Sequence, residues 1–169
     1  RLVVPNGHNV RAGVMLRRRD DRTGGRGREG GTGVEVMRMC FSGDSFVSGK
    51  GEDECRGWTG RICSAARRRG RDITLYNLGI RRDTTADIAE RWEREARVRL
   101  TPEHDGRLVF SFGVNDCVTE ERGQPRVPEA ASTINARALL ATAKAGLPTL
   151  MIGPPPTTTN ELILPLNTL

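Results

Sequence analysis

Two hydrophobic periodicities alternate along residues 37–156 of this 169-residue chain. Four short apolar runs predict strands, at residues 37–41, 73–78, 108–112 and 149–152. Between them, apolar residues recur every three or four positions and predict helices, at residues 58–69, 84–97 and 128–146. Because the strands are short, apolar on both faces and separated by helices, they predict an α/β fold with a parallel sheet covered by helices on each side.

The helix at residues 84–97 has the clearest pattern. Thr84 and Asp87 have the spacing of a capping box, in which the hydroxyl and the carboxylate each accept a backbone N–H at the start of the helix. Ile88, Trp92 and Ala96 are expected to face the core. The charged residues of this helix are expected to stay in water: Glu90, Arg91, Glu93, Arg94, Glu95 and Arg97.

The other two helices have weaker apolar stripes. Their inward-facing residues are expected to be Trp58, Ile62 and Ala66 in the first and Ala131, Ile134, Ala138, Ala141 and Ala145 in the last. Gly70 is a natural stop for the first helix. Pro128 suits the first turn of the last helix, and Gly146 suits the position just past its end.

Residues 1–36 differ in composition from the rest of the chain. They hold eight Arg and four acidic residues, a net charge of +4 out of +6 for the whole chain. So much charge and glycine cannot bury enough apolar surface to offset the entropy of ordering. We therefore predict a disordered, basic, Arg/Gly-rich extension at residues 1–36 and a folded domain at residues 37–169. An arm of this kind could contact nucleic acid, but charge runs are usually solvated and no nucleic-acid partner is expected.

No run of about 18 apolar residues and no signal-peptide pattern is visible, which predicts a cytoplasmic protein without a transmembrane segment. The four cysteines, Cys40, Cys55, Cys63 and Cys117, include no CxxC pair, and only His8 and His104 could join them. A zinc site is therefore not expected, and neither a metal nor a cofactor is predicted. Four reduced thiols are the favoured interpretation, with Cys40 a small buried hydrophobic residue.

Small and polar residues follow each predicted strand. Gly43-Asp44-Ser45 follows the first strand, Gly79 ends the second, Gly113-Val114-Asn115-Asp116 follows the third, and Gly153-Pro154-Pro155-Pro156 follows the fourth. In parallel sheets, ligands bind beyond the carboxyl ends of the strands. Ser45 would be exposed there, and the Asn115 amide and the Gly79 N–H could donate to an oxyanion. Taken singly, each of these residues is also an ordinary turn residue.

Taken in order, these motifs resemble the first three sequence blocks of the SGNH (GDSL-type) hydrolase family. The flanking segments GDSFVSGKG, GWTGRI, LYNLGIRRDTT, LVFSFGVND and MIGPPP are also similar to that family, over residues 37–156. The resemblance implies a flavodoxin-like three-layer α/β/α domain that hydrolyses esters or thioesters. It further implies that Ser45 is the nucleophile and that the N–H groups of Ser45 and Gly79, with the Asn115 amide, form the oxyanion hole. Asp44 and Asp116 are interpreted as residues that stabilise turns.

One block of the family is missing from the sequence. An Asp-x-x-His motif, which supplies the general base, is absent, and the resemblance implies that the last strand and helix are absent too. His104 precedes the third strand and is expected at the wrong edge of the sheet, whereas His8 lies in the extension. The resemblance implies a serine ester hydrolase acting on a small-molecule or lipid-like acyl ester. The alternative is a catalytically silent fragment or pseudoenzyme of the same fold.

Two further expectations concern the surface. Arg81 and Arg82 lie close to Gly79 and could bind an acidic substrate or simply be solvated, and the second interpretation is favoured. A sheet without its last strand would leave one edge uncovered, so marginal stability or self-association through that edge is expected. The apolar residues 161–169 could cover part of this surface.

Overall fold

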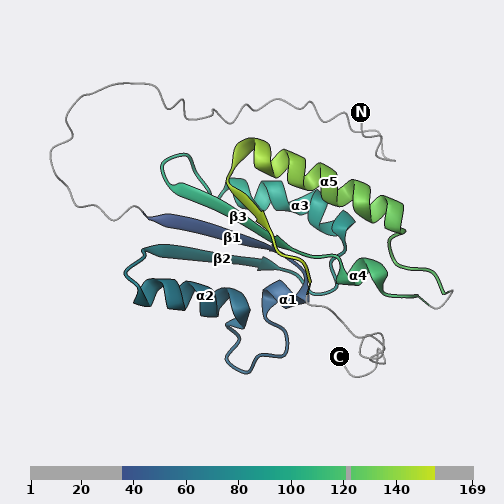
Figure 1. The fold of residues 1–169 in the computed structure, drawn as a ribbon, viewed down its shortest axis with the longest axis horizontal. Helices are drawn as coiled ribbons and strands as arrows, with labels where there is room; N and C mark the ends of the chain where they lie inside the picture. Colours follow the sequence, from purple (N-terminus) through teal and green to yellow (C-terminus); the bar gives the residue numbers. More distant parts are fainter. Residues whose placement is uncertain (1–35, 121–122, 155–169) are drawn as a thin grey trace.

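The computed structural model of the chain describes residues 36–120 and 123–154. The four strands are β1 (Met37–Gly43), β2 (Ile73–Gly79), β3 (Asp105–Ser111) and β4 (Thr149–Met151). The helices are α1 (Ser45–Ser48), α2 (Gly57–Arg68), α3 (Thr85–Arg97), α4 (Val114–Cys117) and α5 (Glu129–Gly146). All strand pairs are parallel, in the order β2-β1-β3-β4 (Figure 1). The predicted α/β fold with a parallel sheet is confirmed. The proposed extension falls almost entirely on residues 1–35, outside the described residues.

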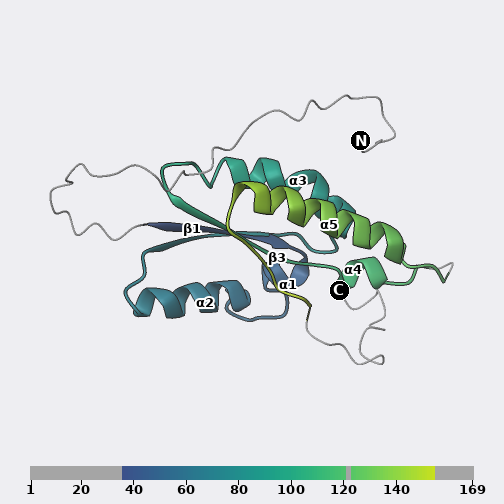
Figure 2. The same ribbon diagram turned by 45° about the horizontal axis from the view of Figure 1, so that its top comes forward.

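Helices cover both faces of the sheet. In Figure 2, α3 and α5 lie on one face, and α1 and α2 lie on the other. Strand residues alternate between the two layers: Cys40 and Phe110 point into the core beneath α3 and α5, whereas Phe41 and Val109 point towards α2. An edge-to-face aromatic pair lies in each layer, Trp92 with Phe110 and Phe41 with Trp58, both at 5.5 Å between ring centroids.

Helix α3 largely follows its pattern. The capping box of Thr84 and Asp87 is present, and Ile88, Trp92 and Ala96 are buried. The expectation that all of its charged residues stay in water is wrong for Arg91, whose side chain is only 12% exposed. Its guanidinium donates to acceptors in β1, in β2 and in the loop after β2. The pattern of α3 alone does not reveal these contacts.

Trp58 and Ala66 of α2 pack against the core as expected, but the buried faces of α2 and α5 differ from those expected at two isoleucines. Ile62 is 50% exposed and Ile134 is 61% exposed. The buried positions of α2 include Thr59 and Cys63. The start of α2 lies close to the end of α1, because Gly57 and Gly49 have no side chains to keep the two backbones apart.

Helix α5 has alanines on several sides, so its apolar pattern does not define a single face. Its buried positions are Leu139 and Ala143, with Ala136 and Leu140 partly buried beside them. Pro128 is the N-cap of α5 rather than part of its first turn, and Gly146 is its last residue rather than the next one.

The four cysteines are free, and two of them are buried. Cys40 is fully buried, as expected of a small hydrophobic residue, and burial raises the pKa of its thiol to about 12. Burial also raises the pKa of Cys63, whereas Cys55 and Cys117 are exposed. The two buried thiols are therefore held in the unreactive protonated form at neutral pH.

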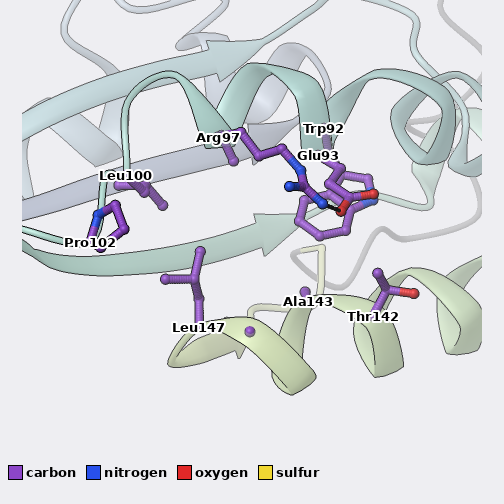
Figure 3. A pocket seen from close by; sticks show the side chains of 10 residues that line it. Trp92, Glu93, Arg97, Leu100, Pro102, Thr142, Ala143 and Leu147 are labelled. Atoms are coloured by element: carbon purple, nitrogen blue, oxygen red, sulfur yellow. Dashed lines mark hydrogen bonds and ion pairs between the residues drawn. The ribbon is translucent and has the colours of Figure 1, made fainter. Parts of the chain in front are cut away.

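An apolar cavity of about 160 Å³ lies between α3 and α5 (Figure 3). Trp92, Leu100 and Leu147 are among the residues that line it, and the Glu93–Arg97 ion pair lies beside it. These are the carboxyl-terminal halves of helices that run against the strands, so the cavity lies near the amino ends of the strands. It is therefore at the opposite end of the sheet from the motifs described above.

Strand β4 forms one edge of the sheet. It is three residues long, and its central residue, Leu150, is 55% exposed. Ile152, just after the strand, is 36% exposed. Leu150 pairs in register with Val109, which belongs to the core under α2, so Leu150 faces the same side of the sheet. Helix α2, however, packs mainly on β2 and leaves Leu150 exposed. An exposed edge strand with apolar side chains is a template for pairing with another chain.

We expect the chain to self-associate through β4, and we expect Leu150→Lys to weaken this association because a charge on an edge strand opposes pairing. Sedimentation velocity over a wide concentration range measures the effect. Ile134→Lys, at a similarly exposed position on α5, is the matched control and should leave association unchanged. A monomer at all concentrations that also unfolds cooperatively above about 60 °C would contradict the expectation.

Candidate active site

The carboxyl ends of three strands meet at one edge of the sheet. Gly43 at the end of β1 is in register with Gly79 of β2 and with Ser111 of β3. Helix α1 begins two residues after Gly43, and α4 follows β3 at the same edge (Figure 1). The register therefore places the segments that carry Ser45, Gly79 and Asn115 beside one another.

Ser45 is the first residue of the four-residue helix α1 and is half-buried. Asp44 is its N-cap, and Asp44 Oδ1 accepts the N–H of Phe46 at 2.9 Å. The Ser48 hydroxyl donates to the Ser45 carbonyl at 2.9 Å. The interpretation of Asp44 as a turn-stabilising residue agrees with these contacts, which hold the Ser45 backbone in place.

The second oxygen of Asp44, Oδ2, is buried and has no hydrogen-bond partner within the described part of the chain. Burial raises the pKa of this carboxyl, and the nearby carboxylates of Asp83 and Asp116 add to the increase, while the N–H of Phe46 opposes it. A buried carboxylate oxygen without a partner is costly. The turn before Ser45 therefore carries an unfavourable polar contact that the fold tolerates.

Two glycines allow the strand ends to approach α1 and one another. A Cβ atom on Gly43 would lie 1.9 Å from the Ser111 carbonyl oxygen, and one on Gly79 would lie 2.3 Å from the Ser48 nitrogen. Both neighbours are backbone atoms, which cannot move aside without disturbing the sheet. Glycine is therefore required at both positions for steric reasons.

The Gly79 N–H, expected as an oxyanion donor, already has a partner. It donates to Asn77 Oδ1 at 3.0 Å. Asn77 Nδ2 donates in turn to the Val47 carbonyl at 2.7 Å and to Thr59 Oγ1 at 3.2 Å, which fixes the orientation of the amide. A ligand would have to share the Gly79 N–H with Asn77 or displace it. Sequence reasoning missed Asn77, although an amide within an otherwise apolar strand is a visible signal.

Asn115 lies in α4 and is half-buried. Its Nδ2 donates to the Asp83 carbonyl at 2.9 Å, which fixes the side chain against the loop between β2 and α3. A primary amide has two N–H groups, so one remains for a ligand.

Asp116 is fully buried, but its partners are not in its own turn. Its two carboxylate oxygens accept the N–H and the hydroxyl of Thr85, at 2.8 and 2.6 Å. The interpretation of Asp116 as a local turn residue is therefore wrong. It joins α4 to the first residue of α3, a contact between residues 31 positions apart that local sequence cannot reveal.

The remaining candidates are placed as follows. Arg81 and Arg82 are exposed, and Arg82 has a left-handed backbone with φ of 72°. His104 immediately precedes β3, at the amino edge of the sheet, where its Nδ1 lies 3.3 Å from Thr101 Oγ1. The expectation that His104 is remote from Ser45 is thus confirmed, since the β1–β3 register sets them at opposite ends. His8 lies outside the described residues.

Among residues 36–120 and 123–154, no three His, Cys, Asp or Glu side chains are grouped so that they could hold a metal ion. Over the same residues, no helix is both long enough and apolar enough to cross a membrane.

The model of the GDSL-like lipase/acylhydrolase family matches residues 41–166. The chain belongs to this family. The match spans the strand ends that carry Ser45, Gly79 and Asn115, and it confirms the resemblance noted in the sequence.

Solved structures of two esterases and of a lipolytic protein share the fold. The psychrotrophic esterase EstA from Pseudoalteromonas sp. is 21% identical, with a TM-score of 0.54 over 70% of this chain and 61% of EstA. The SGNH-hydrolase family esterase AlinE4 is 24% identical, with a TM-score of 0.56 over 72% of this chain and 62% of AlinE4. A putative lipolytic protein of the G-D-S-L family from Desulfitobacterium hafniense DCB-2 is 18% identical, with a TM-score of 0.55 over 74% of this chain and 64% of that protein.

The chain thus spans less than two thirds of the length of these structures. No curated protein gives a significant match.

We predict that Asp116→Ala lowers the free energy of unfolding by about 2 kcal/mol, because it leaves the buried N–H and hydroxyl of Thr85 without acceptors. Urea denaturation measures the change. The control is Glu93→Ala, which removes an exposed ion pair with Arg97 on the same helix and should cost no more than about 0.5 kcal/mol. Equal losses in the two variants would show that the Asp116 contact does not stabilise the fold.

Proposed function

We propose that this chain is a serine ester hydrolase in which Ser45 attacks the acyl carbon of an ester. The observation that carries the proposal is the alignment of Gly43, Gly79 and Ser111 in one register, which sets the Ser45 turn and Asn115 at the same edge of the sheet. Membership of the GDSL-like lipase/acylhydrolase family supports the reaction class.

In the proposed mechanism, a bond forms between Ser45 Oγ and the acyl carbon, and the carbonyl oxygen becomes an oxyanion. When the oxyanion collapses, the bond from the acyl carbon to the ester oxygen breaks, and the alcohol leaves with the proton that the serine gave up. Water then hydrolyses the acyl-serine and restores Ser45.

The N–H groups of Ser45 and Gly79 and the free N–H of the Asn115 amide are the proposed donors to the oxyanion. Asn115 is already held by the Asp83 carbonyl, so its amide needs little reorganisation to donate a hydrogen bond to the oxyanion. The Gly79 N–H would contribute once Asn77 Oδ1 shares it or moves away.

The proton of Ser45 must pass to a base before the alcohol can leave. Within the described residues, the histidine available is His104, at the far edge of the sheet. A hydroxyl without a base is a weak nucleophile at neutral pH. This observation favours a second candidate, a catalytically silent scaffold that binds acyl esters through the oxyanion donors alone. Silent here means without useful turnover: such a scaffold could reach at most the residual rate of about 10³–10⁴-fold over water that other enzymes keep after deletion of a triad residue.

The substrate class follows from the chemistry of the site rather than from its shape. A serine hydroxyl can attack the acyl carbon of a carboxylic ester or of a thioester, and transfer of the acyl group to the serine needs no cofactor. The proposed ligands are small esters, lysophospholipids, thioesters or acetylated sugars.

A fluorophosphonate probe should form an adduct at Ser45 that mass spectrometry locates. Ser45 Oγ bonds to phosphorus, fluoride leaves with the serine proton as hydrogen fluoride, and the phosphonyl oxygen occupies the oxyanion position. Ser45→Ala should abolish the adduct. Ser64→Ala is the matched control, since Ser64 is a half-buried serine on α2 away from this edge. A folded chain without any adduct would select the silent scaffold over the hydrolase.

We also expect Asn115→Ala to slow labelling by about 10²–10³-fold, the usual effect of losing one oxyanion donor. The second-order rate constant of labelling measures this, and circular dichroism checks that the variant is folded. Unchanged labelling in the folded variant would exclude the Asn115 amide from the oxyanion hole.

A further inference from the structure

Arg91 lies on the inner side of α3, and its guanidinium donates hydrogen bonds to four acceptors. Its Nε donates to Asp83 Oδ2 at 2.7 Å, and its Nη1 donates to the Leu78 carbonyl at 3.0 Å and to Glu95 Oε2 at 2.7 Å. Its Nη2 donates to the Gly43 carbonyl at 3.0 Å. One guanidinium therefore joins the ends of β1 and β2, the loop after β2, and helix α3.

Only arginine has the donors for this arrangement. A guanidinium carries five N–H groups in a rigid planar fork, and Arg91 uses four of them here. Lysine has the same charge, but its ammonium is a single point on a flexible stem and cannot reach two strand ends and two carboxylates together. The geometry of the fork, and not only its charge, is what spans the strand ends.

The contacts of Arg91 lead directly to two of the proposed catalytic groups. The Gly43 carbonyl lies two residues before Ser45 and also accepts the Ile80 N–H at 3.0 Å. Asp83 binds Arg91 through its carboxylate and Asn115 through its backbone carbonyl. A shift of the guanidinium would therefore move the Ser45 turn and the Asn115 amide relative to each other.

We propose that Arg91 is a positioning residue that sets the distance between Ser45 and the Asn115 amide. It does so by fixing the Gly43 carbonyl and the Asp83 loop, and it does not touch the substrate. This inference rests on the proposed function for its chemical consequence, but the local effect on the strand ends is independent of it.

The test uses Arg91→Lys and Arg91→Gln, with Arg97→Gln as the matched control. Arg97 lies on the same helix and pairs with Glu93 four residues away, as Arg91 pairs with Glu95, but it is exposed and does not contact the strands. Two readouts are combined: the rate of fluorophosphonate labelling at Ser45, and hydrogen exchange of residues 43–48 and 78–85 compared with residues 107–111 of β3.

Both Arg91 variants should label about 10²-fold more slowly, the scale of loss from small misplacements of a catalytic group. Exchange should rise in residues 43–48 and 78–85 and stay unchanged in β3. Arg97→Gln should match the unmodified chain in both readouts. If Arg91→Gln does not fold, Arg91→Lys decides the question, because it keeps the positive charge between the two carboxylates.

Two results would overturn the proposal. One is that Arg91→Lys is labelled as fast as the unmodified chain and shows the same hydrogen exchange, which would mean that the positive charge alone suffices. The other is that exchange rises equally in β3, which would mean that Arg91 supports general stability only. If the unmodified chain is not labelled at all, the proposed hydrolase function fails, and the exchange pattern still decides whether Arg91 fixes the strand ends.

Discussion

The carbonyl oxygen of Gly43 accepts two hydrogen bonds, one from the Ile80 N–H and one from Arg91 Nη2. This pair of contacts closes the carboxyl ends of β1 and β2 against each other and against α3. The close approach requires glycine, because a Cβ atom on Gly43 would collide with the Ser111 carbonyl. The turn that carries Ser45 begins from this point, so the geometry of the whole edge depends on it.

The same edge is constrained before any ligand arrives. The Asn115 amide is held by the Asp83 carbonyl, Asp116 is held by Thr85, and the Gly79 N–H is engaged by Asn77. Of these groups, the Asn115 amide keeps a second N–H, and a fixed donor of this kind can stabilise a developing negative charge without reorganising. The Gly79 N–H would first have to be shared or released by Asn77. The buried, unpartnered oxygen of Asp44 has the opposite effect on stability. Such local conflicts are expected where a fold serves chemistry as well as packing.

The two ends of the sheet have different roles. The apolar cavity, His104 and the carboxyl termini of α3 and α5 lie at the amino ends of the strands, whereas the polar motifs lie at the carboxyl ends. This division follows from parallel topology, since every strand presents the same end to the same edge. The family match fits this arrangement, because it spans the polar edge and the elements that support it.

The four strands, the three longer helices and the edge of the sheet that carries the polar motifs could be predicted from the sequence. Strand runs, the Thr84–Asp87 capping box and the Gly43-Asp44-Ser45 motif are local patterns, and contacts between neighbouring residues produce them. The buried charged side chains and the inward faces of the helices depend instead on tertiary contacts. Arg91 and Asp116 are buried because their partners come from strands and helices distant in sequence. The periodicity of a sequence shows where polar and apolar residues fall along the chain. It carries no information about which distant residues the fold brings next to each of them.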